Sequence, residues 1–148
     1  MKHRLKHIFY TLLALVGLLV LIYLNGPWPH FEAFDGSPEM EIPPLAGLAA
    51  QIAAQEAAVA KLRPDNEARI VWADSVRKTP CSVVYLHGFS ASQFEGSPIH
   101  ERFAQRYGCN LYLARLAGHG IDEPDAFRGL EPKALVESAK QAIAIGKA

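Results

Sequence analysis

The most pronounced hydrophobic pattern of the chain lies near its N-terminus, where no charged residue occurs over 8–24. At a rise of about 1.5 Å per residue, a helix over this run is just long enough to cross the hydrocarbon layer of a bilayer. Tyr10, Tyr23 and Trp28 lie where the aromatic belts of a membrane helix are found. We therefore predict a transmembrane anchor over 8–24, preceded by a basic tail over 1–7.

A cleaved signal peptide is the main alternative for this run. Cleavage requires small residues at two positions shortly after the apolar core. Here the core ends in "LIYLNGPWP", which has bulky residues and two prolines, and no cysteine follows closely that could carry a lipid. A buried core helix is a third alternative. The pattern favours an uncleaved single-pass anchor.

Three segments follow the apolar run. Residues 25–44 are rich in proline, glycine and acidic residues, which is typical of an extended linker. Residues 45–63 are rich in alanine, with larger apolar residues at steps of three and four, and Pro64 follows them. We predict a helix over 45–63 that packs on the domain; presentation to a partner is the less favoured alternative. The domain itself is predicted over 64–148.

Strands and helices are predicted to alternate within this domain. The patterns indicate strands over 67–73, 82–86 and 110–116, and helices over 97–108 and 131–148. The run "SVVYL" is apolar at almost every position, as in a central parallel strand covered by helices on both faces. We therefore predict an α/β fold with a parallel sheet.

Charge is distributed unevenly along the chain. The totals are 15 Lys+Arg and 15 Asp+Glu. Lys2, Arg4 and Lys6 precede the apolar run, so 12 basic and 15 acidic residues remain after it, a balance of about −3. This gives no electrostatic reason to expect nucleic-acid binding. By the positive-inside rule, the N-terminus is predicted in the cytoplasm and the domain on the periplasmic or extracellular side.

Ser90 is the first candidate for chemistry, because Gly88-Phe89-Ser90-Ala91-Ser92 is a degenerate G-x-S-x-G turn. A nucleophile elbow requires a helix that begins directly after the serine. Gly96-Ser97-Pro98 instead indicates a helix start several residues later. We therefore interpret Ser90 as a loop residue whose hydroxyl caps a turn, and not as a nucleophile.

Two ordered motifs carry a family resemblance. "VVYLHGFSAS", a helix, and then "NLYLARLAGHG" resemble the front half of an α/β-hydrolase, of the lysophospholipase and serine-aminopeptidase type. In that family a His-Gly turn follows the third strand and an R/D-x-x-G-H-G loop follows the fourth. The resemblance covers roughly 68–148, and it implies the N-terminal half of an α/β-hydrolase sheet, preceded by the transmembrane and linker helices.

The resemblance also implies roles for single residues. The amide of Phe89 would donate to the oxyanion, and Gly88 would let the backbone approach a substrate. His87 and His119 are interpreted as structural residues, the latter held between Gly118 and Gly120. Asp122 and Asp125 are expected to cap a helix or face solvent. No metal-ligand spacing and no cofactor motif is recognised.

The family's nucleophile, acid and catalytic histidine would follow later strands, and no such motif precedes Ala148. We therefore expect a membrane-anchored serine hydrolase of carboxylic esters or lipids, cut before its triad and inactive as written. Ester and peptide bonds both stay open as targets. The alternative is a non-enzymatic, membrane-tethered interaction module.

Cys81 and Cys109 each stand one residue ahead of a predicted strand. The resemblance makes these strands parallel neighbours, and a spacing of about 4.8 Å between neighbours lies within the range that a disulfide accepts. The predicted topology places both cysteines in an oxidising compartment. We predict a disulfide, with two buried free thiols as the alternative.

Overall fold

The computed structural model describes residues 2–28, 36, 38 and 41–148. It divides into two compact units, the first ending at residue 34 and the second beginning at 35. Half of the linker predicted over 25–44, including the acidic residues Glu32, Asp35 and Glu39, lies outside the described residues. The two units are therefore considered separately.

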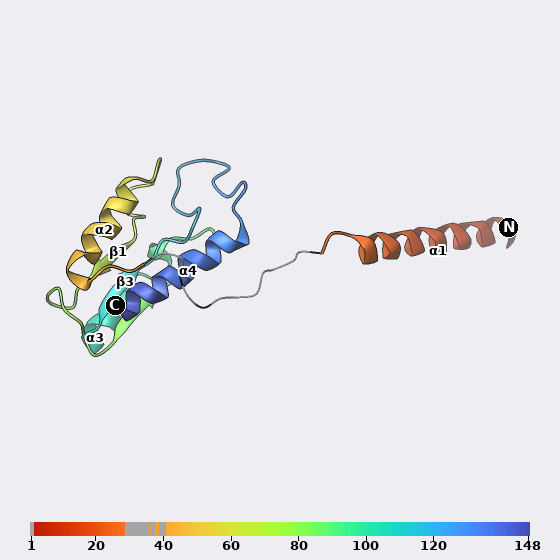
Figure 1. The fold of residues 1–148 in the computed structure, drawn as a ribbon. Coiled ribbons are helices and arrows are strands. Elements are labelled where there is room, and N and C mark those ends of the chain that lie inside the picture. The colour runs from red at the N-terminus through yellow and green to blue at the C-terminus, as the bar shows by residue number, and fades with distance from the viewer. Residues whose placement is uncertain (1, 29–35, 37, 39–40) are drawn as a thin grey trace. The chain divides into compact units, whose positions relative to one another are not determined.

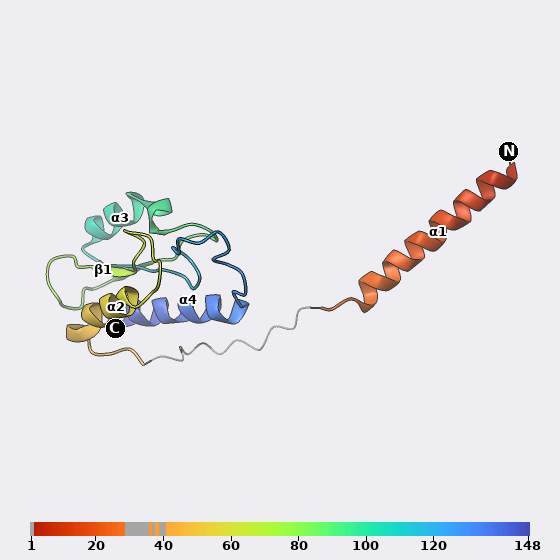
Figure 2. The same cartoon turned by 90° about the horizontal axis from the view of Figure 1, so that it is seen from above.

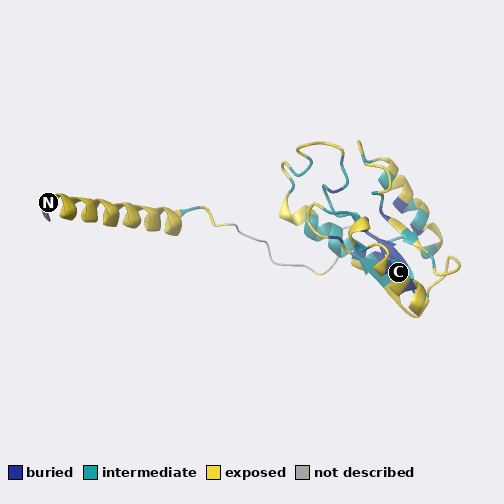
Figure 3. Ribbon diagram, turned by 180° about the vertical axis from the view of Figure 1, so that it is seen from behind, coloured by how far each residue is buried: buried dark blue, intermediate teal, exposed yellow. Residues whose placement is uncertain are grey.

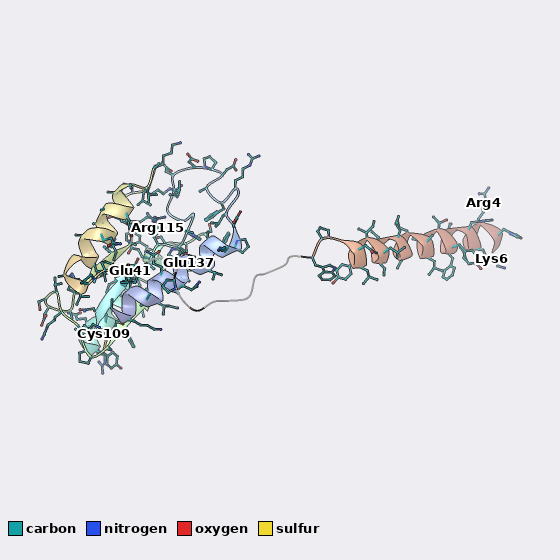
Figure 4. All side chains as sticks on the ribbon, viewed as in Figure 1. Arg4, Lys6, Glu41, Cys109, Arg115 and Glu137 are labelled. Carbon is teal, nitrogen blue, oxygen red and sulfur yellow. A yellow bond between two sulfur atoms is a disulfide. The ribbon has the colours of Figure 1, made fainter. Side chains whose placement is uncertain are left out.

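The described residues of the first unit form one helix, α1, which spans Lys2–Asn25 (Figure 1). Its segment His3–Asn25 has a mean hydropathy of 2.3 and none of it is buried, so it is long and apolar enough to cross a membrane. Arg4 and Lys6 both lie near the N-terminal end of the helix (Figure 4). The helix is apolar on all sides, which is typical of a segment surrounded by lipid.

In the second unit, the described residues form a three-stranded sheet of order β1-β3-β2. The strands are β1 (Arg69–Val71), β2 (Ser82–Tyr85) and β3 (Asn110–Leu113). β2 runs parallel to β3 from Ser82 opposite Asn110, but β1 runs antiparallel to β3. The sheet is therefore mixed, and the prediction of an all-parallel sheet was wrong. No helix separates β1 from β2, so no crossover forces these two strands into the same direction.

The position of β2 also differs from the prediction. Its apolar sequence indicated a central strand, yet β2 forms an edge of the described sheet, and β3 is the central strand. Leu111, Tyr112, Leu113 and the following Ala114 are all buried, while Ser82 is exposed and the rest of β2 is half-buried. Figure 3 shows β3 as the most deeply buried element. Apolar composition alone does not distinguish the two strands.

Helices cover both faces of this sheet (Figure 2). On one face, Tyr112 and Ala114 pack with Leu48 of α2 and with Ala142 and Ile145 of α4. The alternate residues Leu111 and Leu113 point to the other face, where they pack with Ala104 of α3. The period of two along β3 thus divides the apolar side chains between two cores.

The alanine-rich helix α2 spans Leu45–Ala57 and therefore ends earlier than predicted. It packs on the domain, because its two largest inward residues, Leu48 and Ile52, are buried in the core. After the helix, Leu62 forms an antiparallel bridge with Ile121. The apolar residues over 45–63 thus belong to two features: those in α2 pack in the core, and Leu62 forms the bridge to Ile121.

Three further helical elements complete the fold. They are the 3₁₀ turn η1 (Gln93–Gly96), α3 (Ile99–Tyr107) and α4 (Pro132–Lys147). Gly108 ends α3 in the left-handed conformation, with φ of 63°. Pro132 begins α4, where its missing N–H would have no helical partner anyway. The 3₁₀ turn keeps α3 from beginning directly after Ser90.

Candidate functional site

Two loops meet at the carboxyl ends of β2 and β3, which is where parallel α/β sheets bind ligands. The loop after β2 contains Ser90, and the loop after β3 contains Gly118 and Gly120. Together with Glu123, Pro124, Ala126 and Phe127 they line a cleft of about 370 Å³. The His-Gly turn and the Arg-x-x-Gly-His-Gly loop are thus brought together.

His119 holds the two loops in contact. Its Nε2 accepts a hydrogen bond from the backbone amide of Ser90 at 3.0 Å. Its Nδ1 lies 2.9 Å from the carbonyl oxygen of Ala117 and must therefore carry the proton. The side chain is only 1% exposed. His119 is accordingly neutral, and both of its ring nitrogens bind backbone groups.

His87 makes the reciprocal connection. Its Nε2 accepts from the amide of Leu116 at 3.2 Å, and its Nδ1 lies 2.9 Å from the carbonyl oxygen of Gly88. Each histidine thus belongs to one loop and accepts a hydrogen bond from a backbone amide of the other loop. The two rings lie 4.8 Å apart. We call this pair, His87 and His119, the histidine clamp.

Protonation would break the clamp, because a charged imidazole has no acceptor nitrogen. Burial lowers the pKa of His87 below 6.5. The Gly88 carbonyl and Glu95 oppose this shift, whereas the Arg115 guanidinium, and any positive charge on His119, act in the same direction as burial. In this arrangement neither histidine has a free nitrogen to serve as a general base. Their role is to position the loops.

The amide of Phe89 lies between two amides that are already bound. The Gly88 N–H donates to Glu95 Oε2 at 2.7 Å, and the Ser90 N–H donates to His119. Within the described part of the chain, the Phe89 N–H has no hydrogen-bond partner. Its side chain is 69% exposed, and its ring lies 4.9 Å from that of Phe127. This backbone donor is therefore held in place and available to a ligand.

Ser90 has a left-handed backbone, with φ of 64°, and it is exposed. Its contact with His119 comes from the backbone amide, and the described residues offer its hydroxyl no hydrogen bond. The hydroxyl that caps the following turn is that of Ser92, which accepts from the Phe94 amide. The expectation that the Ser90 hydroxyl caps a turn was therefore wrong, because Ser92 does so.

Gly118 and Gly120 both have positive φ, 74° and 75°. A Cβ on Gly120 would approach the Cβ of Asn66 to 2.9 Å, so the position also requires the absence of a side chain. The backbone of Gly120 accepts from the Arg63 amide at 2.8 Å. These glycines let the loop turn tightly around His119.

A bidentate ion pair anchors the same loop to helix α2. Arg115 Nε and Nη2 donate to the two carboxylate oxygens of Glu56 at 2.6 and 3.0 Å. Both side chains are largely buried, and Glu56 also accepts from the Ala68 amide. Arg115 extends to the carbonyl oxygen of His119 at 3.3 Å. The arginine of the motif therefore links α2 to the loop that carries His119.

Sequence reasoning missed Glu56 and Glu95. Glu56 could have been noticed, because it is the only charged residue in the alanine-rich run 45–60. Nothing in the sequence pattern connects Glu95 with the Gly88 amide. Asp122 and Asp125 face solvent and pair with Arg63 and Arg128, as a solvated role implies.

The opposite ends of β2 and β3 are joined covalently. Cys81 and Cys109 form a disulfide with a Cα–Cα distance of 5.0 Å, as the sequence analysis predicts. Cys109 is labelled beside the C-terminal end of α3 in Figure 4. A second cleft, of about 310 Å³, lies at this end between β1, α2 and the end of α4. Its lining is mainly apolar and lacks a catalytic arrangement.

Among the described residues, no three His, Cys, Asp or Glu side chains gather as a metal ion would require. No family model matches the chain, and neither the curated proteins nor the solved structures contain a match. The comparisons therefore do not test the resemblance to the α/β-hydrolases.

Proposed function

We propose that the chain is the N-terminal part of a membrane-anchored serine hydrolase of the α/β-hydrolase type, and that it supplies half of the oxyanion hole. The Phe89 amide would donate to the negative charge that develops on a carbonyl oxygen during acyl transfer. A preorganised donor of this kind contributes about 3–4 kcal/mol to transition-state stabilisation.

A single observation carries this proposal: the Phe89 N–H is unpaired in the described chain, between two amides that are fixed by Glu95 and His119. Phe89 is exposed, so its amide is not among the buried donors that must be satisfied within the fold, and a ligand can reach it. A loop that uses two side chains to hold the neighbouring amides, and leaves this amide free, is organised for a ligand that accepts hydrogen bonds.

The same arrangement argues against Ser90 as the nucleophile. No base is available to it, because both nitrogens of His119 and of His87 bind backbone groups. The nucleophile, its acid and its histidine would be supplied by other segments. A carboxylic ester or a lipid ester is the proposed substrate class, since an anchor in the membrane would keep the enzyme close to such molecules.

The anchor is α1, with the N-terminus in the cytoplasm and the domain outside. The arrangement of Lys2, Arg4 and Lys6 before the apolar segment supports this orientation. A reporter that is active only in the cytosol, fused to the C-terminus, should give no signal. Strong signal would reverse the orientation, and release of a shorter soluble form would establish signal cleavage.

The hydrolase proposal is tested by substitution of Phe89 in a longer form of the protein that includes the segment with the nucleophile. Phe89→Pro removes the N–H and should abolish ester hydrolysis, whereas Phe89→Ala keeps the N–H and should retain most of it. Equal activity of the two variants would contradict an oxyanion role. The module alternative gains little support, because the apolar face of α2 is already used in the core.

A further inference from the structure

Helix α3 exposes an apolar stripe that the fold does not use. Ile99, Phe103 and Tyr107 are 69%, 53% and 59% exposed, and their spacing of four places them on one side of the helix. The rings of Phe103 and Tyr107 lie 4.8 Å apart. The core contacts of α3 come instead from His100 and Ala104, which are buried. We call Ile99, Phe103 and Tyr107 the α3 stripe.

Two arginines accompany the stripe. Arg102 and Arg106 are exposed and lie about one helical turn apart. Neither forms an ion pair with any residue that the structure describes. The acidic residue of the same helix is Glu101, whose Oε1 accepts from the Ser97 hydroxyl and whose Oε2 lies 2.5 Å from His100 Nδ1 without a hydrogen bond. The solvent side of α3 is thus aromatic, apolar and positively charged.

We propose that the α3 stripe docks on the surface of the membrane in which α1 is anchored, with Arg102 and Arg106 at anionic lipid headgroups. Aromatic and aliphatic side chains beside basic ones are the composition of helices that lie in the interface of a bilayer. The inference rests on the proposed anchor, which brings the domain to a lipid surface.

The tether explains how so small a stripe can suffice. Residues 26–44 connect the two units and can extend to at most about 65 Å, so the domain stays near the bilayer. Binding of the stripe is then intramolecular, and a tether of this kind raises the effective concentration into the millimolar range. Three apolar side chains that would bind lipid weakly on their own can therefore dock.

A second copy of the chain fits the stripe less well. In a symmetric contact, the same patch of each copy meets the other, so the unpaired arginines would approach one another. Helix α3 carries a single carboxylate, Glu101, against Arg102 and Arg106, so its charge would stay net positive on each copy. Anionic headgroups supply the missing negative charge.

The test uses the full chain in nanodiscs with and without anionic lipid. An environment-sensitive fluorophore is attached at Ile99→Cys, beside the rest of the stripe, and in a matched control at Ala53→Cys on the exposed side of α2. The oxidised Cys81–Cys109 pair does not react with the label. Lipids that carry a quencher near the headgroup report on depth.

We expect the fluorophore at position 99 to be quenched at least about twofold more than the one at position 53, with a blue-shifted emission. Phe103→Ser with Tyr107→Ser should remove the difference. Arg102→Gln with Arg106→Gln, or an ionic strength of about 1 M, should reduce it only in anionic discs. Equal quenching at the two positions in every lipid would overturn the proposal.

Two other results are distinguished in the same experiment. A blue shift that requires two chains per disc, without lipid quenching, would assign the stripe to a second copy and overturn membrane docking. Recovery of a shorter soluble form would contradict the proposed membrane anchor but would not decide whether the α3 stripe binds lipid. Flotation of that form with the same lipids, with and without Phe103→Ser and Tyr107→Ser, then decides the docking separately.

Discussion

The two ends of the strand pair β2 and β3 are cross-linked by different chemistry. At the amino ends, the Cys81–Cys109 disulfide joins the strands covalently. At the carboxyl ends, the histidine clamp joins the loops through two hydrogen bonds from backbone amides to neutral imidazoles. One connection depends on redox conditions, and the other depends on pH.

This difference shows where the fold can carry function. The disulfide end is closed by a covalent bond, and Cys81 lines the mainly apolar cleft there. The clamp end presents a free amide at Phe89 and a cleft that is lined largely by polar groups. Reversible polar contacts position the loops here without occupying the donor that a substrate would need. The following predictions separate the two ends.

The largest effect is expected at the disulfide. Cys81→Ser with Cys109→Ser, or reduction of the native chain, opens a loop with a sequence separation of 28. The chain-entropy model predicts a loss of about 3–4 kcal/mol in the free energy of unfolding. Urea denaturation with and without reductant measures it, and the double serine variant should not respond to reductant. Two freely alkylated cysteines in unreduced protein, detected by mass spectrometry, would contradict the bond.

Acid should weaken the opposite end. Burial lowers the pKa of His87 below 6.5 in the folded chain. Below pH 6.5, His87 is therefore protonated to a greater extent in the unfolded chain than in the folded chain. The free energy of unfolding should therefore fall as the pH decreases through this window, by up to about 1.4 kcal/mol per pH unit for this group.

His87→Gln is the matched variant for this prediction. Its side-chain oxygen can accept the Leu116 amide proton but does not titrate in this range. The difference in unfolding free energy between native chain and variant should vary with pH below 6.5 and become constant above it. A difference that does not change with pH would exclude His87 as the titrating group.

A smaller loss is expected from Gly120→Ala. Its φ of 75° is unfavourable for alanine, which costs about 1–2 kcal/mol, and the new Cβ would press on Asn66. Gly129→Ala is the control, because its φ of 79° is similar but no atom lies within 4 Å of a Cβ there. Thermal unfolding of both variants measures the loss of stability from backbone strain alone at Gly129 and from strain plus the Asn66 contact at Gly120. Equal losses of stability would mean that the Asn66 contact has no energetic cost.

The smallest effect is expected from Ser90→Ala, which should change the unfolding free energy by less than about 0.5 kcal/mol. Its hydroxyl has no hydrogen bond in the described chain, and the bond of its amide to His119 survives the substitution. Labelling with a fluorophosphonate should leave Ser90 unmodified. Covalent attachment at Ser90 would show instead that the clamp end contains a nucleophile.

Local patterns predicted much of this molecule correctly. The apolar run defined α1, because length and composition suffice for a helix that needs no partner. The strands at Ser82 and Asn110, the helix that begins at Pro132 and the pairing of Cys81 with Cys109 also agree with the prediction. The helices and strands depend on side-chain type and on neighbours close in sequence, whereas the disulfide was predicted from the strand order that the resemblance implies.

The sequence by itself determined which segments are apolar and which turns carry glycine and histidine, because period and turn chemistry are local properties. Only the tertiary structure decided that β1 runs antiparallel, that β3 and not β2 is central, and that Glu56 and Glu95 reach Arg115 and Gly88. Strand direction depends on how the chain closes between elements, and a buried carboxylate finds its partner only when distant segments pack. The free amide of Phe89 belongs to this second group, because only the packed structure determines whether an acceptor reaches a given backbone donor.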